Sequence, residues 1–428
     1  MENAINKAMA VAGKISGNKY LKAVSNGLMA TLPITIIGSI ALLLAVLPVD
    51  FWQSFVSSVG IKSYLSVGYS VTVGVIAVYA SFLIGWRLAK EHGNNSPVPA
   101  GIISLFSFLM MTPLLTIDKT TTLDMSKLGA QGLFTAIIVA LVFTRLYCLF
   151  IDKKIIIKMP EGVPPFVSDM FAGLLPAIFT GFIAIIVSRL FALTPQGSFS
   201  DFVYHILALP LQHLSSSVWS LVFLVLVQMT LWFFGVHGSL VVGSFVTALY
   251  LPMDVQNMDA VTKGVSNGDL PNVLGYTFYN IFSGIGGAGG TLSLLIIILI
   301  FGKAKQSKTV ANLAIVPGLF TVNEPVVFGL PLILNPITLI PFVLTPIVQT
   351  LVAWGAIASG IFPHLNGVQV PFGTPILING FLAGGLLIAV LQVILVAIGC
   401  VIWFPFYMAL DRQQRKQEVA EEPEAVGV

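Results

Sequence analysis

One stretch of this chain constrains its fold more than any other. From residue 309 to residue 410, Glu324 is the only aspartate, glutamate, lysine or arginine. Soluble domains carry charge on roughly a quarter of their residues. A stretch of this length with one charge therefore cannot form a water-exposed surface. A helix of about 20 apolar residues crosses the hydrocarbon core of a bilayer. The stretch therefore predicts several membrane-spanning helices.

The composition of the whole chain supports the same prediction. Of 428 residues, 56% are hydrophobic and 9% are charged, and the mean hydropathy is +0.94. A water-soluble enzyme and a disordered protein are therefore excluded. Long apolar runs, instead of short alternating strands, exclude an outer-membrane barrel. A formal net charge of only +3 disfavours nucleic-acid binding. We expect an all-α polytopic membrane protein with about ten transmembrane helices.

Two groups of five spans are expected, separated by an amphipathic segment at 198–212 that suits an interfacial helix. Residues 1–16 show a similar amphipathic pattern. A break at Gly235-Val236-His237-Gly238 divides one long uncharged run into two spans. Prolines and glycines interrupt 312–333, which predicts a re-entrant hairpin. The expected spans are 27–47, 64–86, 96–116, 128–150, 168–193, 216–235, 237–251, 274–302, 336–358 and 376–408.

The positive charges orient this scheme. With the N-terminus inside, most of the 21 lysines and arginines fall on the inner side, as the positive-inside rule requires. Both termini are then cytoplasmic. The expected divisions are 1–195, a linker at 196–213, 214–410, and a tail at 411–428. We expect no attached soluble domain that handles nucleotides or phosphate, so phosphoryl chemistry would come from another chain. Cys148 and Cys400 lie in apolar stretches and are interpreted as core thiols.

Glu324 is the strongest candidate for function. A carboxylate in an apolar setting costs several kcal/mol, on the order of a protein's whole stability margin, unless it is paired, hydrated or protonated. The residue precedes Pro325, which disfavours helical geometry at Glu324. Interrupted helices near the midplane are where transporters place substrate sites. The alternative is a buried structural carboxylate paired with an amide or a hydroxyl.

His237 is the second candidate, because it lies between glycines and close to Trp232. Neutral imidazole both donates and accepts hydrogen bonds, which suits a sugar hydroxyl. The alternative is a bridge between helices. The five histidines show no ligand pair at helical spacing, so no metal and no cofactor are expected.

A glycine-rich run occupies 284–291, but it lacks the GK[ST] ending of a phosphate-binding loop. Close packing or a hairpin tip is the favoured interpretation, and a substrate contact near Asn280 is the alternative. Aromatic side chains near the breaks, namely Trp232, Trp354 and Phe372, could stack on sugar rings. Packing or interfacial anchoring is their commoner role.

These motifs together resemble a known family. The Gly-Val-His-Gly break, the Gly-Gly-Ala-Gly-Gly-Thr-Leu run and Asn323-Glu324-Pro325-Val326-Val327-Phe328-Gly329 with Pro331 resemble the membrane IIC component of bacterial sugar phosphotransferase systems. The branch is that of lactose, cellobiose and diacetylchitobiose. Gly17-Asn18-Lys19-Tyr20-Leu21 followed by Leu32-Pro33 resembles it too. The similarity extends over nearly the whole chain.

The resemblance implies an architecture and a location. The protein would be a homodimer in the bacterial cytoplasmic membrane. The first half would be a dimerising scaffold, and 214–410 would hold the sugar and move as a unit, in the manner of an elevator. An amphipathic helix would link the halves, as 198–212 does here.

The resemblance also implies chemistry. A disaccharide would be bound outside, carried inward and phosphorylated by a phosphocysteine on a separate IIB protein, itself charged by IIA. The chain would be the transport component of a phosphoenolpyruvate-dependent sugar phosphotransferase, without a phosphocysteine of its own. Glu324 and His237 would act at the reacting hydroxyl. The implied sugar-binding set is Trp232, His237, Gly238, Asn280, Asn323, Glu324 and Phe372.

One departure concerns the substrate. Family members commonly carry Pro-Trp-Thr-Thr-Pro, whereas this chain has Pro371-Phe372-Gly373-Thr374-Pro375. Phenylalanine offers less stacking area than tryptophan and no N–H donor. Cellobiose, diacetylchitobiose and lactose all stay open as substrates. The rival functions are an ion-coupled secondary sugar transporter, with Glu324 carrying the proton, and a passive channel with Glu324 as selectivity residue. An additional role as a receptor for another protein is a weaker alternative.

Overall fold

The computed structural model describes residues 18–46, 50–94, 97–117, 120–160, 162–235, 237–330, 332–371 and 373–421. The chain forms two compact units. The N-terminal unit comprises Lys14–Ser215 and Ser244–Lys263, and the C-terminal unit comprises Ser216–Gly243 and Gly264–Val428. The amphipathic helix expected at 1–16 lies outside the described residues. Each unit is described separately below.

Helices dominate the described residues, as the apolar runs predict. Seven helical stretches are long and apolar enough to cross a membrane: Lys19–Ala45, Ile61–Glu91, Ala130–Asp152, Val167–Phe191, Tyr276–Phe301, Pro336–Ala358 and Leu386–Glu418. Two shorter apolar helices, Pro97–Met111 and Val218–Phe233, also match expected spans. The prediction of an all-helical membrane protein is confirmed.

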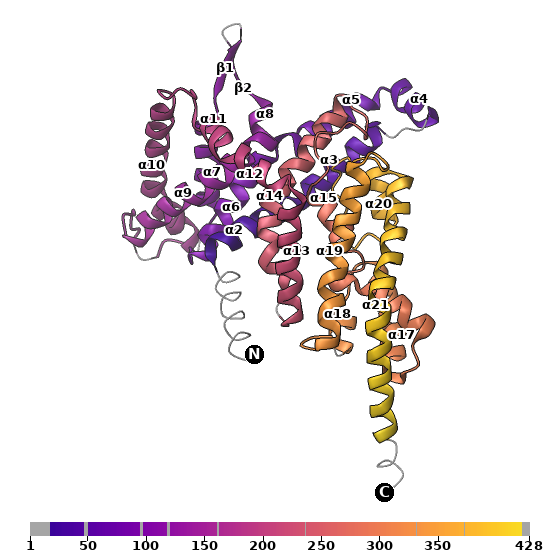
Figure 1. Ribbon diagram of the computed structural model, residues 1–428. Helices are drawn as coiled ribbons and strands as arrows, with labels where there is room; N and C mark the ends of the chain where they lie inside the picture. Colours follow the sequence, from indigo (N-terminus) through magenta and orange to yellow (C-terminus); the bar gives the residue numbers. More distant parts are fainter. Residues whose placement is uncertain are drawn as a thin grey trace. The chain divides into compact units, whose positions relative to one another are not determined.

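The N-terminal unit contains eleven α-helices of its own, three shorter turns and one hairpin within the described residues (Figure 1). Its elements are α2 (Lys19–Met29), α3 (Leu32–Val46), α4 (Asp50–Ser58), α5 (Ile61–Ser70), η1 (Val73–Val75), α6 (Ile76–Glu91), α7 (Pro97–Met111), β1 (Leu114–Ile117), β2 (Thr120–Leu123), α8 (Met125–Leu128), η2 (Ala130–Gly132), α9 (Leu133–Asp152), α10 (Pro165–Phe191), α11 (Phe199–Val203), the π-helical turn η3 (Tyr204–Ala208) and α12 (Leu209–Ser215).

Small residues let the helices of this unit approach closely. Helix α6 packs against α2, α7 and α9. A Cβ on Gly85 of α6 would lie 2.5 Å from the Cβ of Ser104 in α7, and a Cβ on Gly27 of α2 would lie 2.7 Å from the Cα of Ile84. Ser104 Oγ also donates a hydrogen bond to Ser81 O at 2.7 Å. Such contacts replace the hydrophobic effect as the source of helix association inside a bilayer.

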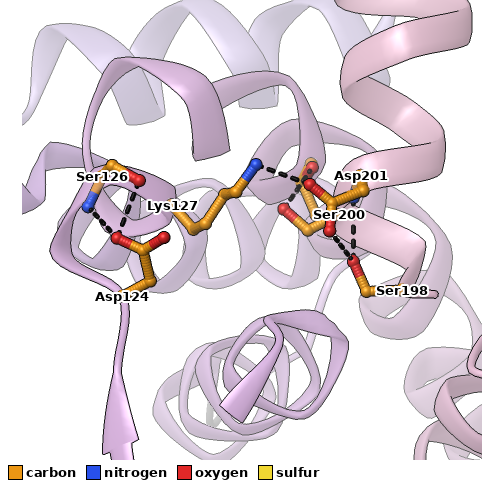
Figure 2. A network of polar contacts seen from close by, with 7 residues as sticks. Asp124, Ser126, Lys127, Ser198, Ser200 and Asp201 are labelled. Atoms are coloured by element: carbon orange, nitrogen blue, oxygen red, sulfur yellow. Dashed lines mark hydrogen bonds and ion pairs between the residues drawn. The ribbon is translucent and has the colours of Figure 1, made fainter. Parts of the chain in front are cut away.

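The linker segment predicted at 198–212 is helical, and polar side chains attach its start to the N-terminal unit (Figure 2). Lys127 Nζ of α8 lies 2.5 Å from Asp201 Oδ1 of α11. Ser198 Oγ accepts a hydrogen bond from Asp201 N at 3.0 Å and donates one to Asp201 Oδ2 at 2.7 Å. Burial would raise the pKa of the Asp201 carboxyl, but hydrogen bonds from Lys127 and Ser198 hold it below its usual range.

The C-terminal unit is built from interrupted helices (Figure 1). Helix α19 packs against both α13 and α21. The elements of the C-terminal unit are α13 (Val218–Phe233), the start of α14 (Gly238–Thr262), α15 (Tyr276–Phe278), the π-helical turn η4 (Tyr279–Ser283), η5 (Ala288–Gly290), α16 (Thr291–Phe301), α17 (Lys305–Leu319), α18 (Glu324–Gly329), α19 (Pro336–Ala358), α20 (Ile378–Gly384) and α21 (Leu386–Glu421).

Several element boundaries differ from the predicted ones. Helix α14 continues past residue 251 to Thr262. The expected span at 274–302 is a regular α-helix only from Thr291, because η4 and the glycine-rich turn precede it. The span expected at 376–408 is divided at Gly385, whose φ is +85°. The hairpin β1–β2, paired from Leu114↔Leu123 to Ile117↔Thr120, was not predicted.

Candidate functional site

The first part of the site is the break between α13 and α14. Helix α13 ends at Phe233, and Gly235 has a φ of +79°, which glycine adopts without strain. Helix α14 then begins at Gly238. A Cβ on Gly238 would lie 2.1 Å from Gln228 O. Only glycine therefore allows the start of α14 to fold back against α13.

This reversal brings two of the predicted residues together. The Trp232 and His237 rings have centroids 4.2 Å apart and planes inclined at 45°. Trp232 is buried, whereas His237 is exposed. The side chain of His237 is thus accessible beside an aromatic base. That arrangement suits hydrogen bonding to a hydroxylated ligand.

A polar network lies beside this pair. Trp232 Nε1 donates to Ser239 Oγ at 3.3 Å, and Gln228 Nε2 donates to the same oxygen at 3.1 Å. Tyr279 OH donates to Gln228 Oε1 at 2.5 Å. The network connects α13, α14 and η4 and fixes the indole of Trp232. Because buried amides are costly unless they are hydrogen-bonded, a network of this kind specifies one geometry.

The sequence analysis did not identify these network residues. A signal was present, because Gln228 is the only amide side chain between residues 218 and 234. A lone amide in an apolar span requires a partner within the protein. The identity of its partners, Ser239 and Tyr279, depends on tertiary packing and could not be read from the sequence.

The second part of the site is the break before α18. Asn323 is buried, and its Nδ2 donates to Ala288 O at 3.1 Å. Its backbone oxygen accepts hydrogen bonds from Val326 N and Val327 N, both at 3.0 Å, which start α18. Asn323 therefore fixes the position at which Glu324 enters the helix. Glu324 is the first residue of α18, and its side chain lies outside what the structure describes.

The glycine-rich run packs against both breaks. A Cβ on Gly287 would lie 2.4 Å from Asn323 Cγ, and the φ of Gly287 is +92°. Gly289 N lies 3.3 Å from Met229 Sδ of α13, and Gly289 O accepts a hydrogen bond from Trp403 Nε1 at 2.9 Å. The favoured interpretation of close packing is confirmed.

Backbone contacts tie the two breaks to each other and to a third segment. Leu334 N, shortly after α18, donates to Phe233 O at the end of α13, at 3.1 Å. Ile376 N donates to Leu319 O at the end of α17, at 2.9 Å. The segment around Ile376 is therefore attached next to the break that precedes Glu324. Phe372 itself lies outside the described residues.

Asn280, another of the predicted site residues, lies outside the hydrogen-bond network of Gln228, Ser239 and Tyr279. Asn280 follows Tyr279 in the π-helical turn and is exposed. Its neighbour, not Asn280 itself, belongs to the hydrogen-bond network described above. Gly238 serves close packing of α13 and α14. Among the described residues, no group of three His, Cys, Asp or Glu side chains could hold a metal ion.

Comparison with known proteins places this geometry in a family. The family model described as "Phosphotransferase system, EIIC" matches residues 25–346. The chain belongs to this EIIC family.

Relatives of this EIIC protein include two curated bacterial components. It is 35% identical to the oligo-beta-mannoside-specific EIIC component of Bacillus subtilis strain 168, over 96% of this chain and 95% of the relative. It is also 35% identical to the cellobiose-specific EIIC component of Geobacillus stearothermophilus, over 97% of this chain and 95% of the relative.

A solved structure supports the fold of this EIIC protein. The crystal structure of the transporter ChbC, the IIC component of the N,N′-diacetylchitobiose-specific phosphotransferase system, matches with a TM-score of 0.90 at 34% identity. The match covers 96% of this chain and 98% of that chain. This EIIC protein is thus a multi-pass sugar permease of the cellobiose family, and its family implies a sugar substrate and a IIB partner.

Proposed function

We propose that this permease binds a disaccharide of the cellobiose, diacetylchitobiose or lactose type and releases it inside as a sugar phosphate. The contact between Trp232 and His237 carries the proposal, because it presents a hydrogen-bonding ring on an aromatic base at an interrupted helix. Names of relatives that specify cellobiose, oligo-beta-mannosides and N,N′-diacetylchitobiose support a sugar of this kind.

Each predicted site residue has a distinct role in this proposal. His237 holds a sugar hydroxyl, and Asn323 positions Glu324 through its hydrogen bond to Ala288 O. Trp232 supports the ring of His237, Gly238 permits its approach, and Phe372 stacks on a sugar ring. Asn280 supplies a further polar contact.

The chemical step assigns Glu324 as general base. The sugar hydroxyl oxygen attacks phosphorus on the phosphocysteine of IIB, and the hydroxyl proton passes to the Glu324 carboxylate. The new O–P bond forms as the S–P bond breaks, and IIB leaves as a thiolate. The added charge hinders return of the product through an apolar path, so trapping drives accumulation.

The assembly and orientation also belong to this proposal. The protein is a homodimer in the bacterial cytoplasmic membrane, with both termini in the cytoplasm. Residues 1–195 provide the scaffold, 196–213 the linker, and 214–410 the moving sugar-binding half. The tail at 411–428 is cytoplasmic.

Uptake into membrane vesicles tests the function. Vesicles containing the protein, with IIB and the phosphoenolpyruvate relay inside, receive a panel of labelled disaccharides. We expect one sugar to accumulate as its phosphate, only with the relay present. Glu324→Gln should abolish this accumulation while the protein still inserts normally. Accumulation of unmodified sugar driven by a proton gradient would favour the ion-coupled transporter instead.

A further inference from the structure

The C-terminal end of α21 and the N-terminal end of α17 form a surface that the sugar site does not explain. The exposed cationic side chains there include Lys303, Lys308, Arg412 and Lys416. We call these four residues the basic surface. All four belong to the C-terminal unit.

Two neighbouring acidic side chains, Asp411 and Glu418, are hydrogen-bonded to the segment at the start of α17. Asp411 is fully buried, and its Oδ1 accepts hydrogen bonds from Lys303 N and Ala304 N, both at 2.8 Å. Asp411 Oδ2 also lies 3.0 Å from Arg415 Nε. Glu418 Oε1 accepts a hydrogen bond from Gln306 N at 3.1 Å.

These bonds satisfy backbone donors that the start of α17 would otherwise leave without partners. Both carboxylates are therefore engaged with α17, while the cations of the basic surface face solvent. A further bond, from Ser307 Oγ to Gln414 Oε1 at 2.5 Å, holds the two helices together. The cations are thus displayed on a rigid frame.

The position of this surface separates it from an ordinary headgroup contact. Cations near span ends are common on the cytoplasmic side of any membrane protein, so positive charge alone does not indicate a docking site. Helix α21 continues from Asp411 to Glu421 after its apolar part, which adds about 16 Å at 1.5 Å per residue (Figure 1). Of the basic surface, Lys416 lies farthest along this extension, five residues past Asp411, or about 8 Å.

The surface also connects directly to the sugar site. Helix α17 begins at Lys305 and ends at Leu319, just before Asn323 and Glu324. Its 15 residues cover about 22 Å at 1.5 Å per residue. A partner that docks on the basic surface would thus lie one helix length from the proposed base.

We propose that the basic surface is where phosphorylated IIB docks on this permease. A phosphoryl group adds about −1.5 to −2 charges to IIB near neutral pH, which strengthens its attraction to a positive surface as it approaches. Complementary surfaces mainly accelerate association and select the partner. This inference rests on the proposed function, because it deepens the identity of the partner that supplies the phosphoryl group.

The test uses the full-length protein in nanodiscs of neutral phosphatidylcholine. The probe is a cellobiose-type IIB protein from the same organism, in phosphorylated and unphosphorylated form. The surface variant is Lys303→Glu, Lys308→Glu, Arg412→Glu and Lys416→Glu combined. The matched control variant is Lys90→Glu, Lys153→Glu, Lys154→Glu and Lys158→Glu combined. The control variant reverses the same number of positive charges as the surface variant. Its four lysines are exposed, belong to the N-terminal unit and are also expected on the inner side of the membrane.

We expect the surface variant to weaken binding of phosphorylated IIB at least tenfold, mainly through a slower association rate. The control variant should change it less than threefold. Raising ionic strength from 0.1 M to 1 M shortens the Debye length from about 10 Å to about 3 Å and should remove the difference. Disaccharide affinity, measured without IIB, should stay equal in all three proteins and shows that they are folded.

Other outcomes would overturn the docking site. Equal loss in both variants would mean that total charge, not this surface, attracts IIB. Unchanged IIB affinity, together with less phosphatidylglycerol copurified from the cell membrane, would make the surface a lipid contact. If the charge-reversal variant fails to fold, a milder combined variant answers the same question: Lys303→Gln, Lys308→Gln, Arg412→Gln and Lys416→Gln. Normal IIB binding without any sugar phosphorylation would contradict the proposed function and leave the docking site standing.

Discussion

At the scale of single residues, the candidate site depends on groups that hold other parts of the site in place. The sequence pointed to His237, Glu324 and Trp232 because charge, polarity and ring size stand out in apolar surroundings. It could not show that Gly238 is needed for helix approach, because the reason is the position of Gln228 O. Nor could it show that Asn323 acts as a support, since its partner Ala288 O is far along the chain.

Gly238→Ala tests the close approach of α13 and α14. A methyl group there would meet Gln228 O at 2.1 Å, and a backbone atom cannot move aside alone. We expect a loss of about 1–3 kcal/mol, as overpacking typically causes, together with weaker sugar binding. Gly243→Ala is the control, because a Cβ there has nothing within 4 Å. Thermal unfolding in detergent measures both; equal melting temperatures would contradict the packing argument.

Gln228→Leu and Tyr279→Phe test whether the polar network positions Trp232 and His237. Each variant breaks the hydrogen bond of 2.5 Å between these side chains. We expect each to weaken disaccharide binding about tenfold, near 1.4 kcal/mol, and the double variant to lose little more, because residues in one network are not additive. Calorimetric titration with the transported sugar measures this cycle. Fully additive losses would mean that the two side chains act separately.

At the scale of elements, periodicity and breakers predicted more than half of the architecture. Uncharged runs located the spans, and Gly235 and Gly238 located the break after α13. The interruption between α17 and α18 was predicted from its prolines, although Pro317 lies inside α17 and the chain turns later, at Thr321 with φ +63°. The hairpin β1–β2 was missed, because its first strand, Leu114–Ile117, is mostly apolar and continues the run expected as the span 96–116.

Lys127→Met tests how firmly the linker is attached to the N-terminal unit. The side chains of Lys127 and Asp201 are only 15% and 24% exposed, so loss of the cation leaves a half-buried carboxylate. We expect a loss of about 1–3 kcal/mol, less than for a fully buried pair. The control is Arg145→Met, whose partner Asp152 is 51% exposed, with a loss below about 1 kcal/mol. Thermal unfolding compares the two, and equal losses would contradict this attachment.

The pH dependence of the contact between Lys127 and Asp201 follows from the pKa of the Asp201 carboxyl. The pKa of Asp201 is lowered in the folded protein, so its stabilisation is present above the ordinary carboxyl pKa of about 3.9. It is lost only as pH falls through the lowered folded value. The stability difference between the parent protein and Lys127→Met should be largest near neutral pH and shrink as the pH falls, because the Asp201 carboxyl of the variant keeps its burial, loses the hydrogen bond from Lys127 and takes up a proton at a higher pH than in the parent. A difference that does not change with pH would assign the effect to another group.

At the scale of the whole molecule, the orientation depends on whether α13 and α14 both cross the membrane. If they do, residues after α14 are outside and the basic surface is inside. If they form one crossing, everything after α14 is inverted while the first five spans are unchanged. Single cysteines decide this, in a background with Cys148→Ser and Cys400→Ser, at four exposed positions: Thr121, Lys153, Ser266 and Gln413.

A membrane-impermeant maleimide added to right-side-out vesicles should label Thr121→Cys and Ser266→Cys. It should label Lys153→Cys and Gln413→Cys only after permeabilisation. The comparison of Thr121 with Lys153 is an internal control, because both positions precede the break between α13 and α14. Inversion of Ser266 and Gln413 alone would show that the break at 234–237 is a single crossing. It would also place the basic surface outside, where no cytoplasmic IIB protein could reach it, so this measurement precedes any test of docking.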